Sequence, residues 1–169
     1  DSMNRYDNTA NSHNEFIFYI KSSNNDKRSD GLKGNFNSGG TSPPEISVSG
    51  SLYADATSRP GDRRAKYYEA LPNGFYRLNK FTESYFDIPV LYYTDLLLMR
   101  AEALAETNTN LTQAINDVNA VISRAFGNKG QNISSTSNRN PLLHEAALEH
   151  RIGTAIEADR WAKVKRKAG

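Results

Sequence analysis

Hydrophobic residues recur at helical spacing in the second half of the chain. Between residues 92 and 107, the sequence YYTDLLLMRAEALAET predicts a helix. Its repeating apolar positions are Leu97, Ala101, Leu104 and Ala105. A second run, NLTQAINDVNAVISRAFG, has the same spacing between residues 110 and 127. Two helices joined by a turn of a few residues form an antiparallel hairpin, here about as long as one tetratricopeptide repeat.

The ends of these helices carry signals of their own. Asn110 can cap the second helix, and Gln113 follows at the partner position of a capping box. Gly127 can adopt the left-handed conformation that ends a helix. After a polar loop, Pro141 fits the first turn of a third helix, which we expect to run to about Lys167.

The first half of the chain has a different pattern, with most of the Gly, Pro, Ser and Asn residues that favour turns. NEFIFYIK, residues 14–21, is rich in aromatic and β-branched residues and predicts a strand. Residues 22–52 predict one long loop, and such loops usually have a function or are disordered. The predicted fold is therefore mainly α. A loop-rich segment (residues 1–88) precedes a helical scaffold (residues 89–169), in which the third helix docks on the hairpin.

Composition limits the possible functions. The net charge of +2 is too small to indicate nucleic-acid binding. Without cysteine there is no disulfide, thiol nucleophile or thiolate metal site. The longest apolar run, Leu96–Met99, is too short to span a bilayer. Because the sequence opens on Asp1 and not on Met, we expect a piece of a longer protein.

Candidate catalytic and metal motifs are weak. In HEAALEH, His144 and His150 are six residues apart and face different sides of a helix, so they do not match a zinc site. The carboxylate pairs Glu102/Glu106 and Glu145/Glu149 each lie on one helix, where such pairs are usually solvated or salt-bridged. No phosphate-binding loop or nucleophile elbow occurs. We therefore predict no catalytic residue, metal or cofactor.

LEHRIGTAIEADRWAKVKR, residues 148–166, places acidic and basic residues among apolar ones beside the only tryptophan. Arg160 follows Glu157 by three residues, within pairing distance on a helix. Glu102, on the hairpin, also needs a cation if it is buried. We predict a structural network between helices, made of Glu102, Glu149, Arg151, Glu157, Arg160 and Trp161.

These residues also carry a family resemblance. DIPVLYYTDLLLMRAEALAET and the 148–166 stretch resemble two helical motifs in the C-terminal region of the SusD/RagB family. The matching positions are Pro89, Asp95, Leu98, Ala101, Glu102 and Ala103, then Glu149, Arg151, Glu157, Arg160, Trp161 and Arg166. The departures are Tyr92 in place of Arg, Gly153 in place of Glu, Ala158 in place of Gly and Lys163 in place of Asp.

The resemblance implies a binding protein and not an enzyme. Family members are lipid-anchored, surface-exposed outer-membrane proteins of Bacteroidetes. They bind glycans, or in some cases peptides, and pass them to a TonB-dependent (SusC-like) transporter. Their ligand contacts lie on loops, so we expect them here in the loop after the predicted strand. The candidates are Arg28, Asp30, Asn35, Phe36 and Asn37.

Two other functions remain open at this point. The helical hairpin also fits a tetratricopeptide-type protein–protein adaptor, which would need further repeats. A carboxylate-based hydrolase would use Glu102 or Glu157 in an open cleft.

The network leads to the first prediction. If its charges are buried, Arg160→Ala leaves carboxylates unpaired and should cost about 3–5 kcal/mol of unfolding free energy. Denaturant melts of both proteins measure this cost, and ligand affinity is compared on the folded fraction. A loss below about 1 kcal/mol would instead identify a surface pair. Normal stability with abolished binding would make Arg160 a ligand contact.

Overall fold

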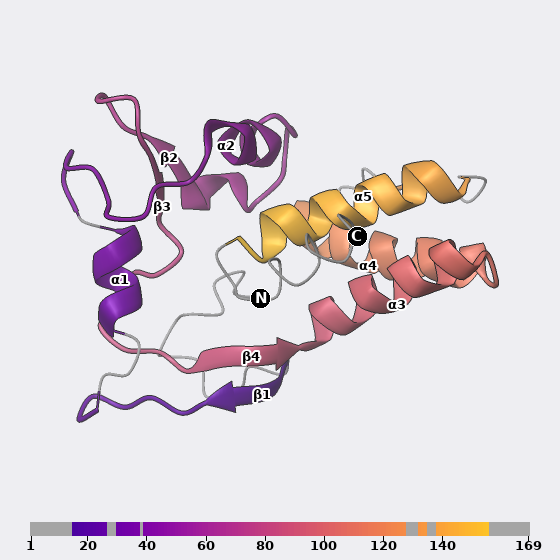
Figure 1. Cartoon of the computed structure of the whole chain (residues 1–169), viewed down its shortest axis with the longest axis horizontal. Helices are drawn as coiled ribbons and strands as arrows, with labels where there is room; N and C mark the ends of the chain where they lie inside the picture. The colour runs from indigo at the N-terminus through magenta and orange to yellow at the C-terminus, as the bar shows by residue number, and fades with distance from the viewer. Residues whose placement is uncertain (1–14, 27–29, 38, 128–131, 135–137, 156–169) are drawn as a thin grey trace, which may run out of the picture. The chain divides into compact units, whose positions relative to one another are not determined.

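The computed structural model describes residues 15–26, 30–37, 39–127, 132–134 and 138–155 (Figure 1). These residues form five α-helices and four short strands, which confirms the predicted mainly α class. The strands make two separate two-stranded sheets. The chain divides into two compact units, with the boundary between Tyr93 and Thr94.

The first unit contains a two-stranded ribbon. Strand β1 (Phe16–Ile20) pairs antiparallel with strand β4 (Ile88–Tyr92), as Figure 1 shows. The strand predicted from NEFIFYIK is thus confirmed. At one end of the ribbon, the Asp87 carboxylate accepts hydrogen bonds from Lys21 Nζ at 3.2 Å and from the Ser22 amide at 3.0 Å.

The prediction of one continuous loop over residues 22–52 is wrong. A short helix, α1 (Asp30–Phe36), lies inside it. Its sequence DGLKGNF contains two glycines, which disfavour a helix, so no local signal predicted it. Tertiary packing stabilises it instead, because Phe36 is buried and its ring lies 5.5 Å from that of Phe81.

Helix α2 (Gly50–Thr57) begins at the end of the same stretch. Ser49 caps it, since its side chain accepts a hydrogen bond from the Leu52 amide at 3.3 Å. The buried residues Leu52 and Ala56 fix the inner side of this helix. Tyr53 stacks on Tyr76 with ring centroids 4.5 Å apart, which joins α2 to the hairpin that follows.

That hairpin was not predicted. After the short 3-10 helix η1 (Ala65–Tyr67), strand β2 (Tyr68–Ala70) pairs antiparallel with strand β3 (Tyr76–Leu78). The turn between them contains Pro72, Asn73 and Gly74, and the Gly74 amide donates to the Leu71 carbonyl. Gly74 has φ = 82°, a conformation that glycine adopts without strain.

In the second unit, the helical hairpin has the predicted form. It consists of α3 (Tyr93–Thr107) and α4 (Leu111–Phe126). Asn110 caps α4 by accepting a hydrogen bond from the Gln113 amide at 3.0 Å, and Gly127 ends it in the left-handed conformation. The reciprocal half of the capping box is not formed, because the Gln113 side chain donates to Asp117 at 2.9 Å.

Helix α5 (Arg139–Gly153) docks on this hairpin, as predicted (Figure 1). Leu142 and Ala146 share a buried core with α3 and α4. The helix is shorter than expected, because it ends at Gly153. The Thr154 hydroxyl and amide both donate to the His150 carbonyl, which closes the last turn. Residues 156–167 of the predicted helix lie outside the described residues.

Three alanines allow the helices of the second unit to pack closely. Ala101 and Ala105 on α3 and Ala114 on α4 are all 0% exposed within the shared core. Protein interiors are close-packed, so a larger side chain at these positions has no free volume to enter.

We therefore predict that Ala105→Leu lowers the unfolding free energy by about 1–3 kcal/mol, because the added atoms overpack the core. Ala103→Leu is the matched control, since Ala103 is exposed on the same helix. Denaturant melts of both variants test this. Equal stability of the two variants would contradict the packing described here.

Candidate functional site

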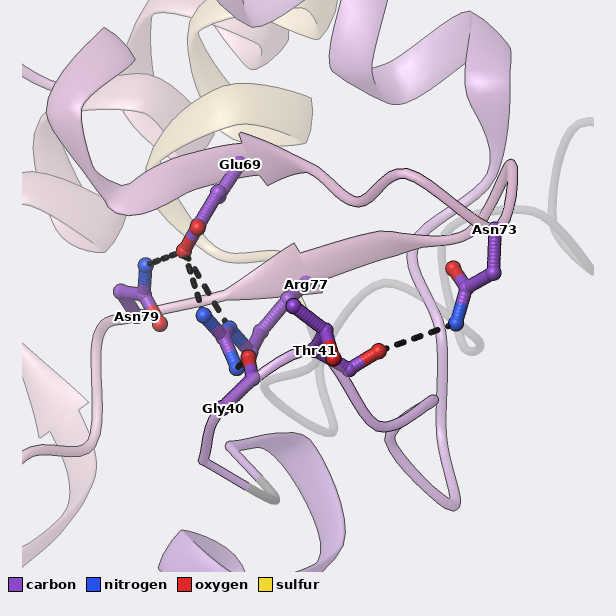
Figure 2. Close-up of polar contacts among 6 residues, drawn as sticks. All are labelled: Gly40, Thr41, Glu69, Asn73, Arg77 and Asn79. Carbon is purple, nitrogen blue, oxygen red and sulfur yellow. Dashed lines mark hydrogen bonds and ion pairs between the residues drawn. The ribbon is translucent and has the colours of Figure 1, made fainter.

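The loop between α1 and α2 is held against the β2–β3 hairpin. Residues 39–46 form this segment, which we call the anchored loop, and nearly all of them are exposed. Arg77 Nη1 donates to the Gly40 carbonyl at 2.7 Å, and Asn73 Nδ2 donates to the Thr41 carbonyl at 3.1 Å (Figure 2). An exposed loop with fixed backbone atoms presents polar groups in a defined arrangement.

The other end of the anchored loop is fixed as well. The Ile46 amide donates to the Asn35 carbonyl at 3.0 Å. Just beyond the loop, the Val48 amide donates to the Tyr76 carbonyl at 3.0 Å, and Ser47 Oγ donates to the same carbonyl at 2.8 Å. The chain therefore runs from α1 to α2 along the hairpin, with attachments on both sides of the exposed residues.

Three side chains of the hairpin form a polar cluster: Glu69, Arg77 and Asn79 (Figure 2). The strand register places Glu69 opposite Arg77. Asn79 lies two residues after Arg77 and so falls on the same face. Arg77 Nε and Nη2 reach Glu69 Oε2 at 3.2 and 2.8 Å, and Asn79 Nδ2 reaches the same oxygen at 2.6 Å. Three donors thus converge on one carboxylate oxygen.

The cluster exposes its carboxylate and buries its cation. The Arg77 side chain is 9% exposed, whereas that of Glu69 is 42% exposed. Hydrogen bonds from Arg77 and then Asn79 lower the pKa of Glu69 below its ordinary value of 4.5. An ionised, partly exposed carboxylate beside an amide can accept hydrogen bonds from ligand hydroxyl groups.

The predicted ligand contacts lie more than thirty positions before this cluster in the chain, and their roles differ. Asn35 and Asn37 are half-buried at the end of α1. In the amide orientation that satisfies its neighbours, the Asn35 nitrogen donates to Glu45 Oε2 at 3.0 Å. Phe36 is 3% exposed and packs on Phe81, so its described role is in the core. Asp30 is the first residue of α1. Arg28 lies outside the described residues.

The predicted Glu/Arg network is described only in part. Glu149 is completely buried in α5, while Glu102 and Arg151 are half-buried. Glu157, Arg160 and Trp161 lie outside the described residues. A buried carboxylate such as that of Glu149 requires hydrogen-bond donors or a cation. The burial of Glu149 is therefore consistent with the network, which remains a prediction.

Other polar pairs connect the three helices of the second unit. His150 Nε2 on α5 lies 2.9 Å from Asp95 Oδ1 on α3, and both side chains are buried. Arg100 on α3 makes two hydrogen bonds of 2.7 Å to Asp117 on α4. Sequence reasoning missed these pairs, although one signal was available. Asp117 lies on the apolar stripe of α4, and a buried acid needs a hydrogen-bond or charge partner.

The described residues show no sign of metal binding or of a membrane span. They contain no group of three or more His, Cys, Asp and Glu residues that could hold a metal ion. Among the same residues, no helix is both long and apolar enough to cross a bilayer. His144, considered above for zinc, is exposed on α5.

Comparison with known proteins gives a consistent result. The model of the SusD family matches residues 79–168. A SusD superfamily protein from Parabacteroides distasonis, with a crystal structure at 1.95 Å resolution, is similar over 87% of this chain, with a TM-score of 0.62 and 20% identity. That likeness supports the fold. The chain spans 38% of the length of that protein. No curated protein matches.

The polar cluster predicts an acid-sensitive contribution to stability. Because the folded pKa of Glu69 is lowered, the stabilisation is present above the unfolded pKa and is lost as pH falls through the folded pKa. Glu69→Gln should therefore reduce the melting temperature at about pH 7, and the difference from wild type should shrink towards about pH 3. Because the carboxylate is exposed and screened, the effect at neutral pH should be below about 1 kcal/mol.

Thermal melts at several pH values measure this difference. Glu83→Gln is the charge-matched control, because no hydrogen bond or ion pair of Glu83 occurs in the part of the chain that the structure describes. A pH dependence that is the same in both variants would contradict a specific role for Glu69.

Proposed function

This chain belongs to the SusD family. We propose that it is part of a surface protein that binds a glycan and delivers it to a TonB-dependent outer-membrane transporter. The family match covers more than half of the chain and includes both helical motifs. The tetratricopeptide-like hairpin with its docked third helix agrees with that assignment.

The anchored loop is the observation that best supports binding. Ligand affinity improves when contacting groups are already fixed, because less conformational entropy is lost on binding. Here, Arg77 and Asn73 fix the backbone of residues 40 and 41, while the side chains from Thr41 to Pro43 remain exposed. Loops on a rigid scaffold are a common place for ligand contacts.

The second unit supports a scaffold role. Asp95 and Asp117 are buried in pairs with His150 and Arg100, respectively. These carboxylates hold helices together and do not face an open cleft. Glu102, which the hydrolase alternative would use, is half-buried on α3. The described geometry thus favours binding without turnover.

The proposal includes a location and a partner. A protein of this family would lie at the cell surface, attached to the outer membrane through a lipid anchor on the full-length protein. Its partner would be a SusC-like, TonB-dependent transporter. A glycan is the favoured ligand, because the anchored loop and polar cluster offer planar amide and carboxylate groups that suit hydroxyls. An oligopeptide is the alternative within the family.

The test is a binding screen with the full-length protein against neutral and acidic oligosaccharides and a set of oligopeptides. We expect affinity for at least one oligosaccharide. Replacing Arg28, Asp30 and Asn37 together by Ala should weaken it about tenfold or more, corresponding to about 1.4 kcal/mol, with little change in the melting temperature. Isothermal titration calorimetry and thermal melts measure the two quantities.

The control is a variant in which three exposed residues of the helical unit are replaced together by Ala: Asn116, Asn140 and His144. Product analysis of the same mixtures should show no cleavage. Cleavage that is lost in Glu102→Gln would establish the hydrolase alternative. Unchanged affinity in the variant of Arg28, Asp30 and Asn37 would remove these three residues from the site.

A further inference from the structure

We propose that Phe75, together with the polar cluster of Glu69, Arg77 and Asn79, forms a subsite for one neutral pyranose ring. This inference rests on the proposed glycan-binding function and specifies where one sugar unit would bind. None of these four residues was among the ligand contacts expected from the sequence.

Phe75 is presented at a fixed position. It directly precedes β3, and its carbonyl accepts a hydrogen bond from the Leu71 amide at 2.9 Å. Its own amide donates to Asn73 Oδ1 at 3.3 Å. The side chain is not part of the core, because Phe75 is 45% exposed. The turn therefore holds an aromatic ring at the surface without using it for packing.

Phe75 and the polar cluster share one side of the hairpin. Side chains alternate along an extended chain, so Phe75, Arg77 and Asn79 lie on the same face. Glu69 joins that face because it pairs with Arg77 across the strands. Aromatic rings beside a few fixed polar groups are typical of small-ligand sites. One face of a pyranose carries C–H groups that pack on such a ring, while its edge carries hydroxyls.

The cluster retains hydrogen-bonding capacity towards such hydroxyls. All three protein donors reach Glu69 Oε2. Glu69 Oε1 and Asn79 Oδ1 receive no hydrogen bond from the described residues, and both can accept one. Two neighbouring acceptors on planar groups match two adjacent hydroxyls of a sugar ring.

Charge indicates which class of sugar fits. The Arg77 guanidinium is almost fully buried and is engaged by Glu69 and the Gly40 carbonyl, so its charge is directed inward. The exposed charge of the cluster is the Glu69 carboxylate. It repels an anionic uronate and accepts hydrogen bonds from neutral hydroxyls. The structure therefore favours a neutral hexose unit.

The experiment uses the full-length protein and titrates maltohexaose, cellohexaose, mannohexaose and an oligogalacturonate. Phe75→Ala should bind the preferred neutral hexasaccharide about five- to tenfold more weakly, because the stacking contact is lost. Phe75→Trp should retain the affinity, since it keeps an aromatic face. Phe18→Ala is the control, because Phe18 is 60% exposed on β1 of the separate ribbon.

The outcomes separate this subsite from the general function. Wild-type protein that binds none of these sugars overturns the subsite, whereas the function is contradicted only if the wider screen of oligosaccharides and oligopeptides also finds no ligand. Wild-type binding that Phe75→Ala leaves unchanged overturns the subsite but keeps the function. Phe75-dependent binding of oligogalacturonate in preference to the neutral sugars, or of a peptide in their place, also overturns it. Melts of each variant confirm that the fold is intact.

Discussion

The Arg77 guanidinium couples the two parts of the candidate site. It is nearly excluded from solvent, and a buried cation is stable only when its hydrogen bonds and charge are matched. Glu69 supplies the charge from the neighbouring strand, and the Gly40 carbonyl supplies an acceptor from the loop. Because one group satisfies both contacts, the pairing of the strands and the position of the loop depend on each other. The hairpin is only three residues long in each strand, so this side-chain contact is important for its geometry.

Much of the second unit could be predicted from sequence because its signals are local. Asn110 and Gly127 mark both ends of α4, and the apolar stripe between them identifies its buried face. The end of α5 was missed because helical spacing continues past Gly153, whereas the Thr154 hydroxyl closes the helix there. The pairing of Asp95 with His150 joins residues 55 positions apart, and no local pattern indicates such a partner.

The first unit was predicted less well, because its elements depend on contacts between residues distant in the sequence and its strands are short. Helix α1 depends on burying Phe36 against Phe81, a contact that sequence alone does not indicate. The Pro-Asn-Gly turn was a usable hairpin signal, but its flanking strands are too short to show clear alternation. From the sequence, we expected the ligand contacts within the stretch after β1. The two side chains that hold the anchored loop, those of Asn73 and Arg77, come more than thirty positions after the residues they bind.

The anchors of the loop consist largely of its own backbone atoms. The hairpin holds the carbonyls of Gly40 and Thr41, and the amides of Ile46 and Val48 complete the attachment. Every residue has a backbone carbonyl, and every residue except proline has a backbone amide N–H. These backbone bonds therefore do not depend on which side chains the loop carries. The exposed positions 41 and 43 can therefore diversify while the loop keeps its path. A single scaffold of this kind can acquire new ligand preferences through substitutions at these positions, without re-evolving its fold.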